Sequence, residues 1–302
     1  MKPVSLAHVS DLHLPFEPAL KISQRLSKRQ LSAWSWRRRG AIQRPEIVEA
    51  LAADLRTHAP DHIVVTGDVT NFSLPAEFER AAAWLSALAP IERISLVPGN
   101  HDALVPVEPA LGLDRWARWT RLKDDQWPFV HRLAGDAVAL IGLNSALPTA
   151  PLLARGRLGR HQLARLDAIL RDEGDAGRLR VLLLHHPVAA GAVRWRKALA
   201  DAEALRALLA RHGAELVLHG HARDSRFDAL EGPRGPIPCL CVPSSSALPN
   251  PRDEGARWNR LVLSRDDEGA RAQVQVREWS VAHDGFIDGA VHTLRLPPGP
   301  RG

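Results

Sequence analysis

The sequence contains no tyrosine, one methionine and only two cysteines among 302 residues. So few cysteines exclude a small scaffold held together by disulfides and favour a reducing compartment. No apolar run approaches the roughly 20 residues that a membrane-spanning helix needs. The stretch at residues 1–14 also lacks the long apolar segment and small-residue cleavage site of a signal peptide. These absences predict a cytoplasmic globular protein.

The remaining composition is that of a folded chain with a basic balance. Hydrophobic residues make up 45% and charged residues 25%, which excludes intrinsic disorder and allows a sizeable core. Forty Lys and Arg stand against 34 Asp and Glu, and the net charge of +6 favours anionic partners such as phosphate esters, nucleic acid or a membrane surface. Arginine outnumbers lysine 35 to 5, which the codon bias of a GC-rich genome also explains.

Apolar β-rich runs alternate with helical patterns over the first 221 residues, as in an α/β sheet. The expected strands are 4–9, 62–66, 91–97, 137–143, 179–184 and 216–218, and the expected helices are 45–58, 75–88, 158–170 and 201–211. Shorter strands at 225–230, 237–242, 260–264 and 272–279 predict that an antiparallel sheet finishes the fold. No linker divides the chain. We therefore expect one domain over residues 1–295 and a disordered tail at 296–302, where prolines and glycines prevent regular structure.

Side chains of the metal-ligand type end five of the apolar runs. The segments are HVSDLH (8–13), VVTGDVTN (64–71), LVPGNHD (96–102), LLLHHP (182–187) and LVLHGH (216–221). Because the carboxyl ends of strands in an open α/β sheet lie at one edge, we expect these residues to meet there. Carboxylate, imidazole and amide ligands without thiolate suit Mn, Fe or Zn. Two such ions sharing a carboxylate clamp a phosphate and activate water, so the sequence predicts a phosphoester hydrolase.

The order of these segments resembles that of a known family. DLH (11–13), GDVTN (67–71), PGNHD (98–102), HHP (185–187) and HGH (219–221) resemble the five motifs of the calcineurin-like metallophosphoesterases, over roughly residues 4–223. The resemblance implies the metallo-dependent phosphatase fold, a four-layer α/β/β/α sandwich of two mixed sheets. It also implies two divalent metals and hydrolysis of a phosphomonoester or phosphodiester by a metal-bound hydroxide.

The resemblance assigns a role to each ligand-type residue. The metal ligands it implies are Asp11 and His13 at the first ion, Asp68 as the bridge between both ions, and Asn100, His185 and His221 at the second ion. His101 would protonate the leaving oxygen. Asp102 would orient His101, with an Asx-turn role as the rival hypothesis. His186 is expected to be a structural or substrate-facing residue.

The last motif departs from the family pattern of Gly, His, variable, His. Here the chain reads Gly220, His221, Ala222, Arg223, so an arginine stands where a ligand is expected. Three hypotheses follow. His219 substitutes, since HxH spacing puts both side chains on one side of an extended segment; water fills the position; or Arg223 clamps the substrate phosphate. We predict an active enzyme that holds its first metal more loosely.

A basic insertion at about 17–40 follows the first motif. Residues 21–40 are rich in Lys and Arg, include Trp34 and Trp36, and contain no acid. The position predicts a lid or side wall beside the metal edge. Residues 20–40 are hypothesised to contact an anionic membrane surface, which would place the protein peripherally on the inner face of the membrane. The rival hypotheses are a basic helix packed on the core and, with less support, a strip for nucleic-acid phosphates.

The leading hypothesis is therefore a dinuclear metallophosphoesterase that acts on a nucleotide or lipid-headgroup substrate. A nuclease is the alternative within the enzyme class. A catalytically silent, partner-binding protein with the same fold is the alternative outside it, supported only by Arg223. Trp116 and Trp119 are expected in the core, because residues three apart share a helical face.

Overall fold

The computed structural model describes residues 1–17, 27–39, 42–120, 126–250 and 254–299 and contains two six-stranded mixed sheets. In spatial order, the first sheet consists of β12 (Gly285–Arg295), β11 (Gly269–Ser280), β10 (Arg257–Asp266), β1 (Val4–Val9), β2 (His62–Val65) and β3 (Ile94–Leu96). The second consists of β4 (Phe129–Leu133), β5 (Val138–Gly142), β6 (Leu179–Leu183), β7 (Leu216–His219), β9 (Ile237–Cys241) and β8 (Arg226–Leu230). The helices are α1 (Lys28–Arg39), α2 (Pro45–His58), α3 (Pro75–Leu88), α4 (Ala117–Thr120), α5 (Arg160–Asp175) and α6 (Ala202–His212).

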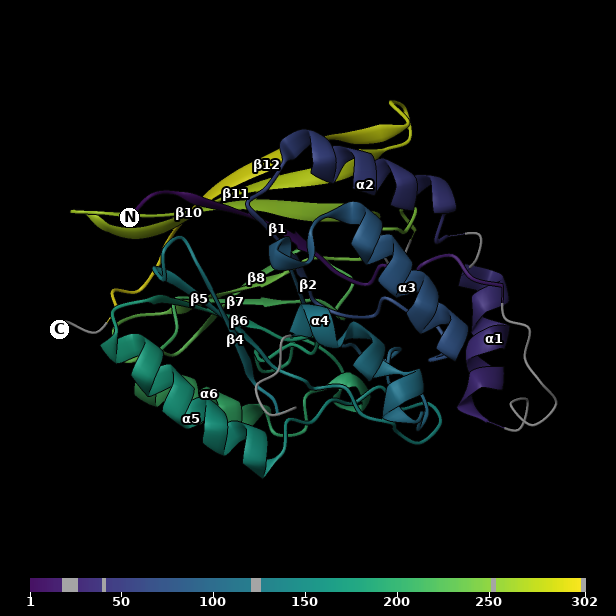
Figure 1. Cartoon of the computed structure of the whole chain (residues 1–302), viewed down its shortest axis with the longest axis horizontal. Helices are drawn as coiled ribbons and strands as arrows, with labels where there is room; N and C mark the ends of the chain where they lie inside the picture. Colours follow the sequence, from purple (N-terminus) through teal and green to yellow (C-terminus); the bar gives the residue numbers. More distant parts are fainter. Residues whose placement is uncertain (18–26, 40–41, 121–125, 251–253, 300–302) are drawn as a thin grey trace.

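The sheets and helices form four layers. Helices α2 and α3 cover the outer face of the first sheet, and α5 and α6 cover that of the second (Figure 1). Three apolar clusters fill the interfaces: one beneath α2 and α3, one between the sheets, and one beneath α5 and α6. In the middle cluster Leu6 of β1 and Val64 of β2 are grouped with Leu218 of β7. The predicted four-layer sandwich is confirmed.

Local chemistry explains the two helices over the first sheet. Helix α2 begins with Pro45 in its first turn, and the apolar residues spaced along it, such as Ile47 and Leu51, are buried. Helix α3 carries the buried Glu77 in its first turn, and this carboxylate accepts hydrogen bonds from the backbone amides of Asn71, Phe72 and Leu74. That carboxylate pairs donors that would otherwise be buried without acceptors.

The carboxyl-terminal strands differ from the prediction of one closing antiparallel sheet. β10, β11 and β12 complete the first sheet in antiparallel order, whereas β9 joins the second sheet parallel to β7 and carries β8 antiparallel at the edge. The tail also begins in ordered structure, because Leu296 is buried and its amide donates to the carbonyl of Ala270. The predicted disorder is thus wrong for Leu296, and residues 300–302 lie outside the described part of the chain.

A buried ion pair ties the second sheet to its helices. Nη2 of Arg180 on β6 lies 2.8 Å from Oε1 of Glu215, and both side chains are 1% exposed. Nη1 of Arg180 also donates to the carbonyls of Leu170 in α5 and His212 in α6. The arginine therefore satisfies acceptors on two helices and on the residue that precedes β7.

Trp116 and Trp119 belong to the core as predicted, since each is 1% exposed. Among the described residues, no helix has the length and apolar character that crossing a membrane requires.

Candidate metal centre

The ligand-type residues meet where the strands of both sheets end. Asp11 and His13 follow β1, Asp68 follows β2, Asn100 and His101 follow β3, His185 follows β6 and His221 follows β7. Gly220 allows the closest approach, because a Cβ there would lie 1.9 Å from Ser10 Oγ and 2.6 Å from Asp11 Oδ2. The backbone amide of His221 then donates to Asp11 Oδ2 over 3.0 Å, which joins the last motif to the first.

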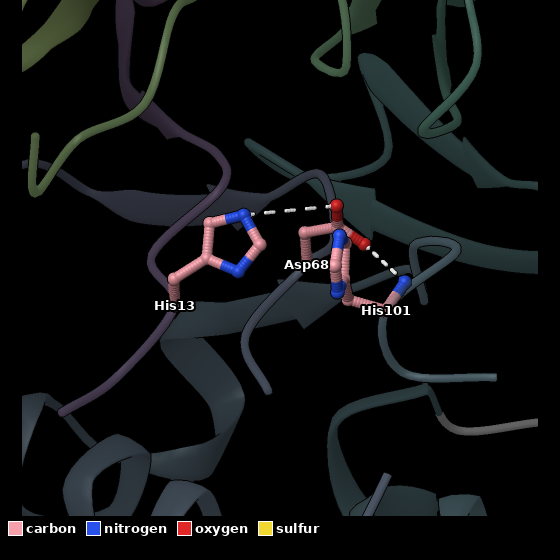
Figure 2. A group of neighbouring side chains, drawn as sticks. All are labelled: His13, Asp68 and His101. Carbon is pink, nitrogen blue, oxygen red and sulfur yellow. Dashed lines mark hydrogen bonds and ion pairs between the residues drawn. The ribbon is translucent and has the colours of Figure 1, made fainter. Parts of the chain in front are cut away.

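The first cluster consists of His13, Asp68 and His101, whose ligand-type atoms lie within 4.8 Å of one another. Figure 2 shows the His13 ring directed at the Asp68 carboxylate, with Nε2 3.8 Å from Oδ2. Nδ1 of His13 donates to the carbonyl of Thr70 over 3.2 Å, and this contact orients Nε2 toward the carboxylate. Oδ1 of Asp11 lies 4.0 Å from the same Nε2 and adds a second carboxylate to the cluster.

The second cluster consists of Asp68, His185 and His221, again within 4.8 Å. Nε2 of His185 lies 3.4 Å from Asp68 Oδ2 and 3.3 Å from Asn100 Oδ1, while Nδ1 donates to the carbonyl of Thr66 over 2.7 Å. Asp68 therefore belongs to both clusters.

The electrostatics of these side chains fit a pair of cations. Burial lowers the pKa of His185, but the carboxylates of Asp68 and Asp11 outweigh burial and raise the pKa to about 9. The His185 imidazole is thus positively charged at neutral pH, and the oxygens of Asp68 and Asn100 lie close to its Nε2. A divalent ion can supply the same positive charge to these ligands. The residues present fit two metal ions that share the Asp68 carboxylate.

Backbone strain accompanies the candidate ligands. Four of them have left-handed backbone conformations, with φ of 49° at Asp11, 40° at His13, 54° at Asp68 and 69° at His221. Such values are uncommon for residues with a Cβ and persist where the surrounding structure enforces them.

Asp102 is hydrogen bonded to two loops at this edge of the sheets. Its carboxylate accepts hydrogen bonds from the amides of Gly99 and Thr70 and from the Thr70 hydroxyl, at 2.8, 2.8 and 2.9 Å. The carbonyl of Asn71 accepts from Nδ1 of the His101 ring over 3.0 Å. Asp102 therefore fastens the loop after β2 to the loop after β3. This is a wider role than an Asx turn, in which Asp102 would accept from the Leu104 amide, because that amide donates to Ser73 Oγ.

Two other predicted residues belong to neither cluster of described residues. His186 is fully buried, and its ring nitrogens contact Ser145 Oγ at 2.8 Å and the Ala154 carbonyl at 3.2 Å. Its ring centroid lies 5.1 Å from that of His185 and 4.6 Å from that of His221, so it packs against the second cluster and supports a loop. His219 is buried too, its Nδ1 donates to the Gly220 carbonyl, and it belongs to neither cluster of described residues. His219 does not replace the missing histidine in this structure.

Two basic residues interact electrostatically with the carboxylates of the clusters. Burial raises the pKa of Asp11, and the positive charges of His185 and Arg223 oppose that rise. The pKa of the half-buried Lys197 is lowered, mainly by burial and secondly by the charge of Arg223. The carboxylates of Asp11 and Asp68 oppose this lowering. The Lys197 carbonyl also lies 3.1 Å from His221 Nε2. Sequence analysis missed Lys197, because it lies in a loop without a motif.

Helix α1 forms the predicted side wall of this edge. Nζ of Lys28 donates to Thr149 Oγ1 and to the Leu153 carbonyl, both at 2.7 Å, in the loop after β5. Nε of Arg29 donates to the Phe72 carbonyl over 2.9 Å, in the loop after β2. The helix thus joins loops from both sheets and stands at the end of the molecule remote from the termini (Figure 1). Residues 20–26 and 40 of the proposed membrane strip lie outside the described residues.

Comparison with known families decides the identity. The family model described as calcineurin-like phosphoesterase matches residues 4–222. The chain belongs to this family. As a calcineurin-like phosphoesterase it is a hydrolase of phosphate esters, and the family depends on two metal ions.

Individual relatives agree with this assignment. The calcineurin-like phosphoesterase described here is 26% identical to a probable cyclic nucleotide phosphodiesterase of Synechococcus sp., covering 87% of this chain and 89% of the relative. It is 34% identical to a glycerophosphodiester phosphodiesterase of Enterobacter lignolyticus over 42% of each chain. A dimetal phosphatase structure from Danio rerio shares the fold, with a TM-score of 0.64, 14% identity and coverage of 98% and 99%.

Proposed function

We propose that the protein is a metal-dependent phosphodiesterase that acts on a small phosphodiester of the nucleotide or lipid-headgroup class. The observation that carries the proposal is the position of Asp68, a buried carboxylate shared by two clusters of ligand-type residues. Relatives named as cyclic nucleotide and glycerophosphodiester phosphodiesterases support a diester over a monoester. Mn, Fe or Zn suits the donor set, because the clusters combine imidazole and carboxylate without a thiolate.

Each side chain contributes a separate part of the chemistry. Two bound ions would neutralise the phosphate charge and activate the attacking water. His101 would protonate the leaving oxygen, and two contacts fix its position: its amide donates to Asp68 Oδ1 over 2.7 Å, and its ring is held by the Asn71 carbonyl. Arg223 and Lys197 would hold a phosphate oxygen through their positive charge.

We further propose a single domain over residues 1–295 and a cytoplasmic location. An anionic membrane surface stays the proposed partner of residues 20–40. Lys28 and Arg29 are engaged with backbone carbonyls of the core, so other basic residues of the segment would have to supply the contact. Liposome sedimentation that is indifferent to anionic lipid would contradict this partner.

The substrate preference is tested with a chromogenic pair. We expect bis(p-nitrophenyl) phosphate to be hydrolysed with a kcat/KM at least about tenfold above that of p-nitrophenyl phosphate, a difference of about 1.4 kcal/mol in barrier. Chelation should remove the activity and added Mn should restore it. Absence of turnover with every metal and ester would favour the silent binding protein. Hydrolysis confined to DNA, with binding that weakens steeply with salt, would favour the nuclease.

Arg223→His should restore the family's missing ligand. Because the first cluster then gains an imidazole, we expect that metal to be held about tenfold or more tightly, an effect of about 1.4 kcal/mol or more. Equilibrium dialysis against a graded series of free Mn concentrations measures the change. Arg211→His on the exposed surface of α6 is the control and should leave metal affinity unaltered. Equal affinity in Arg223→His and the unmodified protein would show that Arg223 does not occupy a ligand position.

A further inference from the structure

A large apolar cavity lies directly beside the loop that carries Asn100 and His101. Its volume is about 790 Å³, within the range of roughly 300–1,000 Å³ typical of small-molecule sites. Pro98, Asp102 and Ala103 of the metal-binding loop form one wall. Ala146 and Pro148, from the loop after β5, form another. The cavity is therefore continuous with the loops that shape the metal centre.

The walls keep apolar surface exposed to the cavity, although Leu113 and Trp127 also pack against the core. Several apolar residues lining the cavity are only partly buried, namely Ala103, Val105, Val107, Leu113, Trp127 and Ala146. Residues of this kind are normally packed in the core or scattered singly on the surface, and a concave group of them marks a binding site. The cavity thus has the character of a site for an apolar ligand.

The polar groups of the lining are already engaged or are acidic. Asp102 directs its carboxylate to backbone amides, and the indole nitrogen of Trp116 donates to the Phe78 carbonyl over 3.2 Å. No lysine or arginine occurs among the described residues that line the cavity. A phosphate would find no positive partner inside it, whereas Arg223 follows His221 of the second cluster by two residues and the Lys197 carbonyl lies 3.1 Å from the His221 ring. The positive partners for a phosphate and the apolar walls for an organic group therefore lie in different parts of the molecule.

We propose that this cavity binds an apolar, ring-sized organic group of the phosphodiester substrate while the phosphate occupies the metal centre. This inference rests on the proposed function and deepens it. The substrate class becomes a phosphodiester in which one alcohol carries an apolar group. A phosphodiester of polar alcohols alone would leave the cavity filled with water and would bind less tightly.

Two phosphonates that differ only in their organic group test the proposal. Phenylphosphonate should inhibit bis(p-nitrophenyl) phosphate hydrolysis at least about tenfold more strongly than methylphosphonate, because a phenyl ring in the cavity removes much more apolar surface from water than a methyl group does. Val107→Trp, which fills the cavity, should abolish that difference and leave the methylphosphonate inhibition constant unchanged. Val281→Trp is the matched control, since Val281 is exposed and distant in sequence from the lining residues. Ala146→Leu, in the opposite wall, serves as the second filling variant if Val107→Trp does not fold.

A binding measurement separates failure of this proposal from failure of the proposed function. The chelated, metal-free protein should bind the fluorescent aromatic anion 1-anilinonaphthalene-8-sulfonate, and both filling variants should lose that binding. An active diesterase with equal inhibition by the two phosphonates would overturn the cavity proposal alone. An inactive protein that still binds the fluorophore in the cavity would overturn the proposed function and support the cavity as an apolar site.

Discussion

Asp68→Asn is expected to lower turnover by about three orders of magnitude or more, equivalent to about 4 kcal/mol of barrier. Metal content should fall from two ions to at most one per chain. Asparagine preserves the volume of the side chain and an acceptor for the His101 amide, but it replaces the one carboxylate that belongs to both clusters. Initial rates with bis(p-nitrophenyl) phosphate and elemental analysis of dialysed protein measure the two effects.

The matched control is Asp172→Asn. Asp172 lies on the surface of α5 with 65% of its side chain exposed, so its substitution should change neither quantity. If Asp68→Asn retained both ions and full turnover, the shared-carboxylate centre and the chemistry proposed for it would be abandoned.

Glu215→Leu should destabilise the fold by about 3–5 kcal/mol, because it leaves Arg180 charged and buried without a carboxylate. Both side chains are 1% exposed, so water cannot replace the lost partner without opening the second sheet. Urea denaturation followed by circular dichroism measures the free energy of unfolding.

Two comparisons isolate the cause of that loss. The double variant Arg180→Met with Glu215→Leu removes both charges and should recover most of the stability, to within about 2 kcal/mol of the unmodified protein. Glu46→Ala breaks the exposed Arg44–Glu46 pair, whose side chains are 43% and 58% exposed, and should change the free energy of unfolding little, because water replaces the lost partner. A Glu215→Leu loss as small as that of Glu46→Ala would contradict a tightly buried pair.

Much of the fold follows from local patterns that tertiary structure did not override. The helices predicted at 45–58 and 75–88 are α2 and α3 with the same bounds, because first-turn prolines and regular apolar spacing mark them clearly. The strand β12 was missed because it lies at the edge of the first sheet and most of its residues are partly or fully exposed, which removes the apolar signal. The strand predicted at 91–97 is shorter because residues 91–93 form a 3-10 turn.

Residues of the candidate site could be predicted from the sequence only where a ligand-type side chain directly follows an apolar strand. Asp11, Asp68 and His185 follow apolar strands directly, so sheet geometry brings them together. The pairing of His219 with His221 failed because the chain does not stay extended there: the Ala222 amide donates to the Gly220 carbonyl, and His221 has a φ of 69°. Lys197 lies beside the clusters through long-range folding alone, which no local pattern in the sequence records.

The left-handed backbone at Asp11, His13, Asp68 and His221 has a consequence for how this protein tolerates change. Strain of this kind costs on the order of 1 kcal/mol or more at each residue, so glycine at these positions would relax the chain while removing a ligand. Conformational preference and ligand chemistry thus select different amino acids at the same four places. The folded chain should be most robust when cations are plentiful, since an ion that binds only the native state shifts the folding equilibrium toward it.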